Sequence, residues 1–293
     1  MNKKVKFELL KVGFCNHLEC IAMRAGRVEL VEFPALCGLI EHPEKGFMLY
    51  DTGYSDHFEK AAEGFPECLY KYATPIQLPF EEKLEIQLHR RGIQRRDISY
   101  ILISHFHADH IAGLKDFPEA KFISSESEYR SLQKMNSFER LFRAVLSDLI
   151  PNDFERRAEF METKKSFDLP RNLSPFTEGF DLFEDESVIG INLPGHTESQ
   201  MGILFRDQEE KLNFLVGDAV WGMDALLQDK KPSDFARNVF YNQEQYDQTF
   251  DSLRKLFFTP ESPRLIPSHC NRTWKQIQKE ISDRKQSLAS ASL

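Results

Sequence analysis

The stretch Ser104-His105-Phe106-His107-Ala108-Asp109-His110 comes directly after an apolar run, Ile98-Ser99-Tyr100-Ile101-Leu102-Ile103. The run is short and rich in branched residues, which is typical of a buried strand. Imidazole rings and carboxylates are ligands for zinc and related divalent ions, and a loop after a strand can fold around an ion. Three histidines and one aspartate are more than one tetrahedral ion with an open position needs. The stretch therefore predicts a two-metal site.

Three later segments repeat this pattern of an apolar run followed by one side chain that can bind a metal. These side chains are His196, Asp218 and His269. Each lies close to a glycine or proline that sets a tight backbone path. Ligand sites in layered α/β proteins gather at the carboxyl ends of strands, so we expect the three to join the first cluster.

The composition limits the classes of function. The chain has 293 residues, and its 41% hydrophobic content is enough for a sizeable core. A net charge of −8 disfavours nucleic acid as a partner. No apolar run approaches bilayer length and no signal peptide is recognisable, so we expect a cytoplasmic protein with no membrane partner. Five scattered cysteines without a CxxC pair indicate reduced thiols.

The remaining pattern predicts a single domain, residues 1–293, with one insertion. Residues 135–183 are rich in phenylalanine and partly helical in spacing, and we expect a helical insertion there, with Ser137 as the N-cap of its first helix. A capping-box pattern at Asn242 predicts the start of a later helix.

Two strands are expected before the histidine cluster, at residues 28–33 and 35–41. A Pro-x-x-Gly turn at residues 43–46 then predicts a hairpin, and Asp51 follows the next apolar run.

Taken together, these motifs resemble the metallo-β-lactamase superfamily over residues 28–269. The matching positions are the full set of seven ligands, His105, His107, Asp109, His110, His196, Asp218 and His269. The resemblance implies an α/β fold, a four-layer αβ/βα sandwich with two mixed sheets face to face and helices outside.

The resemblance also implies a role for each ligand. The first ion would be held by His105, His107 and His196. The second would be held by Asp109, His110 and His269. Asp218 would bridge the two ions. Asp51 matches the family's Asp-Thr-Gly, where the aspartate steadies a ligand histidine, although a plain turn aspartate is the alternative.

Within the superfamily the chain is similar to the N-acyl homoserine lactonases. The similar segments are Phe33-Pro34-Ala35-Leu36-Cys37, Leu193-Pro194-Gly195-His196-Thr197 and Gly217-Asp218-Ala219. Those lactonases place a tyrosine three residues after the bridging aspartate, where it holds the substrate carbonyl. This chain has Trp221 there, which donates a hydrogen bond but has no acidic hydroxyl. Tyr241 is a candidate substitute.

The function implied is a metal-dependent hydrolase. A hydroxide shared by two divalent ions would attack a lactone or other ester carbonyl, with Asp109 orienting the hydroxide and moving the proton. Asp109, Asp218 and Trp221 are the candidate catalytic residues. Zinc is the favoured cofactor, and Fe, Mn and Co also suit these ligands.

Other functions remain open. The same core supports a glyoxalase-II-like thioesterase or a phosphodiesterase, for which Arg272 would be a basic residue near the metals. A metal-bearing binding or regulatory protein with vestigial activity is an alternative from another class. The insertion at 135–183 would form a lid over an apolar pocket or a homodimer contact, so the expected partner is a small substrate with an apolar or acyl portion.

Overall fold

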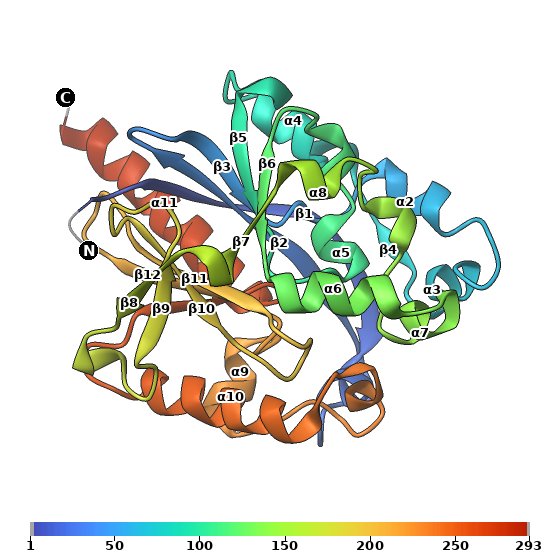
Figure 1. Cartoon of the computed structure of the whole chain (residues 1–293). Coiled ribbons are helices and arrows are strands. Elements are labelled where there is room, and N and C mark those ends of the chain that lie inside the picture. The colour runs from blue at the N-terminus through green and yellow to red at the C-terminus, as the bar shows by residue number, and fades with distance from the viewer. Residues whose placement is uncertain (1–2, 292–293) are drawn as a thin grey trace.

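The computed structural model describes residues 3–291 and builds two sheets from strands that lie far apart in the sequence (Figure 1). The first sheet has the strand order β4-β1-β2-β3-β5-β6-β7, and the second has the order β13-β12-β11-β10-β9-β8. The first sheet consists of β1 (Lys6–Leu18), β2 (Leu30–His42), β3 (Gly46–Tyr50), β4 (Ile76–Gln77), β5 (Ile98–Leu102), β6 (Lys121–Ser124) and β7 (Ala158–Phe160). The second consists of β8 (Lys165–Asp168), β9 (Glu178–Asp181), β10 (Val188–Asn192), β11 (Met201–Arg206), β12 (Leu212–Gly217) and β13 (Arg264–Pro267).

The helices are mostly short. They are α1 (Glu19–Ala22), α2 (Asp56–Ala61), α3 (Cys68–Ala73), α4 (Leu84–His89), α5 (Ala108–Ile111), α6 (Glu126–Lys134), α7 (Ser137–Phe142), α8 (Phe154–Arg157), α9 (Met223–Gln228), α10 (Gln243–Phe257) and α11 (Asn271–Ala291). Single turns of 3-10 helix lie at Phe80–Glu82, Arg95–Asp97, Leu114–Asp116, Ser147–Leu149, Met161–Thr163, Arg171–Leu173 and Ala236–Val239. No helix within residues 3–291 has the length and apolar character needed to cross a bilayer.

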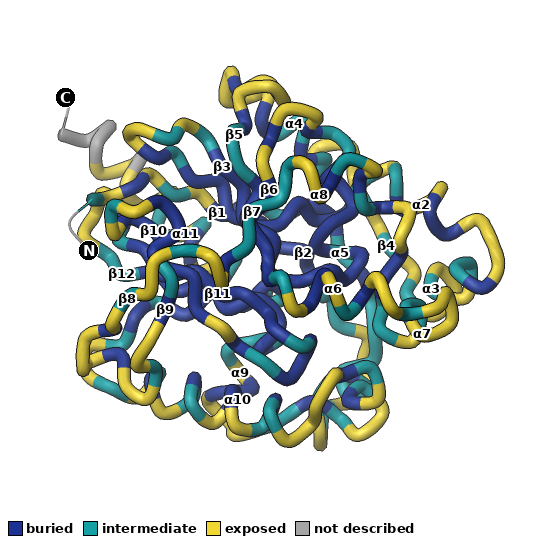
Figure 2. The backbone as a smooth tube through the Cα atoms, viewed as in Figure 1, coloured by how far each residue is buried: buried dark blue, intermediate teal, exposed yellow. Residues whose placement is uncertain are grey.

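Three apolar cores hold four layers together. The inner faces of the two sheets meet in one core, where Ile40 and Leu102 of the first sheet join Ile203 of the second. The outer face of the first sheet packs against α2, α4 and α6, and the outer face of the second packs against α9 and α10. Figure 2 shows the strands as the buried centre of the molecule and the helices as its more exposed shell. The predicted four-layer sandwich of two mixed sheets is confirmed.

The strand prediction was wrong at Pro34. Residues 28–33 and 35–41 were expected as two strands, but one long strand, β2, runs through the proline. Pro34 lies opposite Phe14, next to a register shift between Lys11 and Phe14 of β1. A bulge tolerates a residue without an N–H, so the ladder continues past it. The strand β1 is not predicted from the sequence.

The segment 135–183 mixes short helices with three strands, β7, β8 and β9. Asn136, and not Ser137, caps α7. The Asn136 side chain accepts a hydrogen bond from the Glu139 amide at 3.0 Å, and the Glu139 carboxylate accepts one from the Asn136 amide at 2.8 Å. The helix ends early because Ala144 has a left-handed φ of 54°. Beyond it, β7 joins the first sheet and β8 and β9 join the second, so the expectation of a helical segment was wrong there. Short alternating runs such as that in β8 carry a weak strand signal.

Candidate metal centre

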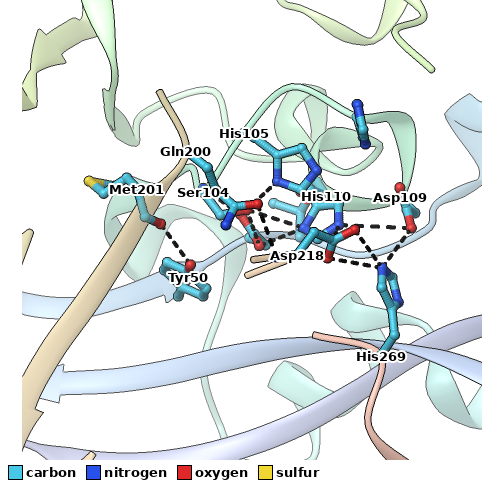
Figure 3. Close-up of polar contacts among 12 residues, drawn as sticks. Tyr50, Ser104, His105, Asp109, His110, Gln200, Met201, Asp218 and His269 are labelled. Atoms are coloured by element: carbon cyan, nitrogen blue, oxygen red, sulfur yellow. Dashed lines mark hydrogen bonds and ion pairs between the residues drawn. The ribbon is translucent and has the colours of Figure 1, made fainter. Parts of the chain in front are cut away.

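The seven predicted ligands lie together in the folded chain. Figure 3 shows five of them, His105, Asp109, His110, Asp218 and His269, converging on one site. His105 and His107 lie in the loop between β5 and α5, and Asp109 and His110 lie in the single turn of α5. His196 lies in the loop between β10 and β11, Asp218 directly follows β12, and His269 lies two residues after the end of β13. Because β12 and β13 are parallel, their carboxyl ends deliver Asp218 and His269 side by side.

The ligands form two groups that share one carboxylate. One group is His105, His107, His196 and Asp218, and the other is Asp109, His110 and His269, with the ligand atoms of each group within 4.8 Å of one another. Asp218 Oδ1 lies 3.3 Å from His110 Nε2 and 3.1 Å from His269 Nε2. Asp218 Oδ2 lies 3.2 Å from His196 Nε2. Asp218 is therefore placed between the two groups.

Ser104 fixes the tautomer of His105. The Ser104 hydroxyl donates to Asp51 Oδ2 at 2.7 Å, because the carboxylate can only accept. Because its O–H points to Asp51, the hydroxyl oxygen accepts a hydrogen bond from His105 Nδ1 at 2.9 Å. His105 Nε2 is then a free lone pair, and it is buried with no hydrogen-bond partner.

The rings of His110 and His269 are oriented in the same way. His110 Nδ1 donates to Asp51 Oδ2 at 2.8 Å, and His269 Nδ1 donates to the Pro34 carbonyl at 2.8 Å. Both Nε2 atoms therefore face the shared carboxylate of Asp218 and are the ring nitrogens available to a metal. A ligand histidine whose other nitrogen is held by an acceptor is typical of metal sites in proteins.

The rings of His107 and His196 face each other through one nitrogen of each ring. His107 Nδ1 lies 3.1 Å from His196 Nε2. Burial, followed by the neighbouring His196 ring, holds the pKa of His107 well below its usual range. Burial and the His110 and His107 rings do the same to the pKa of His105. Neutral imidazoles are the form that binds a metal.

The second group is electrostatically different. Burial opposes protonation of His110, but the carboxylates of Asp109, Asp218 and Asp51 raise its pKa well above the usual value. Burial opposes protonation of His269 as well, yet Asp218 raises its pKa. The pKa of Asp218 is held well below its usual range by His269 and His110 despite its burial. Positive charge is favoured at this position, whether it is carried by protons or by metal ions.

The residues fit a bound metal. Buried polar atoms without hydrogen-bond partners cluster here: His105 Nε2, His110 Nε2, His196 Nδ1 and Asp218 Oδ1. Leaving such atoms unpaired costs about 1–3 kcal/mol each, and coordination would satisfy those that face the ligand groups. Imidazole nitrogens with one shared carboxylate suit zinc and its neighbours.

Two glycines hold the ligand loops. Gly195 has a φ of 122°, and a Cβ there would lie 2.1 Å from the Tyr246 amide nitrogen. Only glycine fits at this close approach, which places the following residue, His196. Gly217 has a φ of 53° before Asp218, whose amide donates to Gln200 Oε1 at 3.0 Å.

Trp221 lies beside the ligand groups, and its indole N–H donates to Asp218 Oδ2 at 3.1 Å. Tyr241 is 41% exposed, with the Arg143 guanidinium over its ring, and it does not line the cavity that opens onto both ligand groups. Tyr54 and Tyr70 do line that cavity.

A cavity of about 480 Å³ opens onto both ligand groups. Its apolar walls come from three parts of the chain: Leu69 of α3, Phe138, Leu141 and Phe142 of α7, and Val239. No lysine or arginine among residues 3–291 lines it. Arg272, considered for a basic role, forms an ion pair with Asp224 at 2.6 Å and stays outside this cavity.

Sequence reasoning missed several residues of the site. They are Ser104, Glu128, Gln200, Tyr70 and His17, the last of which lines the cavity from β1. Ser104 stands inside the quoted motif, so its position beside His105 was the one available signal. The others come from elements whose packing the sequence does not reveal.

Comparison with known proteins gives a consistent result. Residues 30–256 match the family model of the metallo-beta-lactamase superfamily. The chain is 23% identical over 264 residues to the N-acyl homoserine lactonase AttM of Azorhizobium caulinodans, covering 88% of this chain and 90% of that protein.

Solved structures with the same fold include two lactonases. A substitution mutant of AiiA from B. thuringiensis, with N-decanoyl-L-homoserine bound at its active site, matches with a TM-score of 0.69 at 17% identity, covering 94% of this chain and 97% of that chain. AidC, a dizinc quorum-quenching lactonase in complex with a product, matches with a TM-score of 0.63 at 14% identity, covering 93% and 90%. At these identities the likeness concerns the fold alone.

Proposed function

The chain belongs to the metallo-beta-lactamase superfamily and is a metal-dependent hydrolase. We propose that it uses two divalent ions, with zinc as the favoured metal, to hydrolyse a lactone or other ester that has an apolar acyl portion. The observation that carries the proposal is the apolar cavity of about 480 Å³ that opens onto both ligand groups. An acyl chain would gain about 0.8 kcal/mol for each methylene buried there.

The seven ligands divide between the two ions as the resemblance implies. His105, His107 and His196 would hold the first ion. Asp109, His110 and His269 would hold the second. Asp218 would contact both. Bound in this way, divalent ions supply a hydroxide nucleophile at neutral pH and a positive charge that stabilises a developing oxyanion.

Asp109 and Trp221 would act beside the ions. The Asp109 side chain lines the cavity, and its Oδ2 lies 3.4 Å from His269 Nε2. A carboxylate there can accept a proton from the nucleophile and return it to the leaving group. The Trp221 indole holds Asp218 through its N–H, which keeps the shared carboxylate in place.

The charge of the cavity favours a neutral substrate. A phosphodiester would be expected to meet lysine or arginine close to the ions, because its negative charge must be stabilised. The described part of the cavity wall has neither, and Arg272 is paired with Asp224 elsewhere. This supports an ester or lactone over a phosphodiester.

The test combines metal analysis with a substrate panel. The purified protein would be assayed for metal content and for hydrolysis of acyl homoserine lactones, aryl esters, an acyl thioester and bis-p-nitrophenyl phosphate. We expect about two ions per chain and turnover of the lactones or esters. Changing His107 and Asp109 to Ala together should abolish turnover and lower the metal content.

The matched control is His57→Ala, which changes a part-exposed histidine paired with Asp116 on the surface. It should leave metal content and turnover unchanged. Turnover of only the thioester or the phosphodiester would move the substrate class. A chain that binds no metal and hydrolyses nothing after reconstitution would contradict the proposal.

A further inference from the structure

A buried carboxylate on α6 links the two histidine loops of the first ligand group. Glu128 is 4% exposed. Its Oε1 accepts from the Phe106 amide at 3.0 Å, and its Oε2 accepts from the Thr197 hydroxyl at 2.9 Å. Each oxygen of one side chain therefore serves a different loop.

The two loops belong to different sheets. Phe106 lies between the ligands His105 and His107, after β5 of the first sheet, and Thr197 directly follows His196, after β10 of the second. The rings of His107 and His196 face each other at 3.1 Å. A change in the spacing of the loops would move these two nitrogens apart or together.

The cost of burying this carboxylate indicates that its two contacts matter. No lysine, arginine or histidine within the described residues forms an ion pair with Glu128. Burying a carboxyl group without a cationic partner costs free energy, and the hydrogen bonds from the Phe106 amide and the Thr197 hydroxyl offset part of that cost. Hydrogen bonds to a backbone amide and a hydroxyl fix direction as well as distance. The geometry is what an apolar replacement would lose.

We propose that Glu128 is a positioning residue that fixes the separation of the two loops and thereby sets the affinity for the ion held by His105, His107 and His196. It acts through Phe106 and Thr197 and touches neither substrate nor metal. This inference rests on the proposed two-metal function.

The test compares three variants by metal retention against chelators of increasing strength. Glu128→Ala removes both contacts, and Thr197→Val removes one while keeping the shape of the side chain. In each variant the affinity for one of the two ions, measured by competition with the chelators, should be about 10- to 100-fold lower than in the unmodified protein. This is the range expected when a partner of a metal ligand is removed. Glu128→Gln can still accept from Phe106 and donate to Thr197, so it should restore retention to within about threefold.

Double variants identify the ion that is lost. Glu128→Ala added to His196→Ala should cause no further loss, because both changes act on the same group. Glu128→Ala added to His110→Ala should leave almost no metal. Equal weakening of both ions in Glu128→Ala would overturn the inference.

Glu126→Ala is the matched control, since Glu126 lies on the same helix with a 43% exposed side chain and pairs only loosely with Arg130. It should retain both ions. If Glu128→Ala does not fold, Thr197→Val and Glu128→Gln decide the question, and full retention in Thr197→Val overturns the inference. An unmodified protein that binds no metal would instead contradict the proposed function, which separates the two failures.

Discussion

His110 and Asp51 are joined by a hydrogen bond of 2.8 Å from the ring Nδ1 to the carboxylate Oδ2, and Asp51 makes it from a left-handed backbone φ of 60°. That conformation is uncommon for residues other than glycine, but aspartate and asparagine tolerate it. It turns the chain at the end of β3, while the Ser104 amide donates to the other oxygen of Asp51 at 2.8 Å. The carboxylate thereby orients the ring of a metal ligand.

Asp51→Asn tests this relationship without disturbing the backbone, because asparagine also accepts a left-handed φ. The amide cannot accept from both Ser104 and His110 as the carboxylate does. We expect metal affinity to fall about 10- to 100-fold, measured by metal retention against a chelator. Asp56→Asn, a surface change at the start of α2, should have no effect. Unchanged retention in Asp51→Asn would show that His110 needs no partner.

Trp221→Phe removes the indole N–H that donates to Asp218 and keeps most of the ring. Losing one hydrogen bond of this kind costs about 1 kcal/mol, which corresponds to roughly fivefold in kcat/KM. Trp221→Tyr places a phenol at the position where the resembling lactonases have one, and we expect it to raise lactone turnover relative to Trp221→Phe. The measurement is kcat/KM for one acyl homoserine lactone across the three proteins. Identical kcat/KM values in the three proteins would show that Trp221 has no role in the reaction.

The apolar cavity predicts a dependence on acyl chain length. At about 0.8 kcal/mol per buried methylene, kcat/KM should rise up to about fourfold for each added methylene until the cavity is full. Leu141→Ala, which trims the α7 wall, should flatten this rise for long chains and leave short chains unaffected. A series of linear acyl esters measures it. A flat profile in the unmodified protein would place the acyl portion outside this cavity.

The sequence predicted the layered architecture and the grouping of the candidate ligands, but not every element around them. The seven candidate ligands lie in one cluster because the four segments that carry them follow the ends of β5, β10, β12 and β13, and a strand end is a position that the local pattern reveals. The residues that orient the ligands were mostly missed. Glu128 reaches Phe106 from a separate helix, and that contact depends on tertiary packing, which leaves no periodic signal in the sequence.

The errors in the fold have a common cause. Pro34 predicts a break between two strands, but a bulge in the neighbouring β1 accommodates the proline. The helical spacing after residue 137 predicts a longer helix, but Ala144 adopts a left-handed φ that ends it, and alanine does not favour that conformation. In each case a contact distant in the sequence, or an unusual φ, overrode the local preference.

Gly195→Ala should disrupt the site through the backbone. The added Cβ would lie 2.1 Å from the Tyr246 amide nitrogen, and the φ of 122° is unfavourable for alanine. We expect a loss of about 3 kcal/mol in the free energy of unfolding and a displaced His196. Thermal unfolding and metal content measure the two effects. Gly222→Ala is the matched control, because a Cβ there meets nothing within 4 Å. Equal behaviour of the two variants would contradict the close approach.

The buried position of His42, which is not a metal ligand, leads us to expect that the protein loses stability in mild acid. Its Nδ1 accepts from the amides of Glu44 and Lys45, both at 3.0 Å, and its Nε2 donates to the Ser187 hydroxyl at 2.9 Å. Burial lowers the pKa of His42, although the Asp185 carboxylate opposes this shift. Below about pH 6.5 the unfolded chain therefore binds a proton that the folded chain refuses, and the free energy of unfolding falls by up to about 1.4 kcal/mol per pH unit until the folded-state pKa is reached. Urea unfolding of the metal-loaded protein between pH 7.5 and 5 (roughly the range of histidine titration) measures the slope. His42→Gln should be less stable at pH 7 but show a shallower slope, and an unchanged slope would assign the acid sensitivity to other groups.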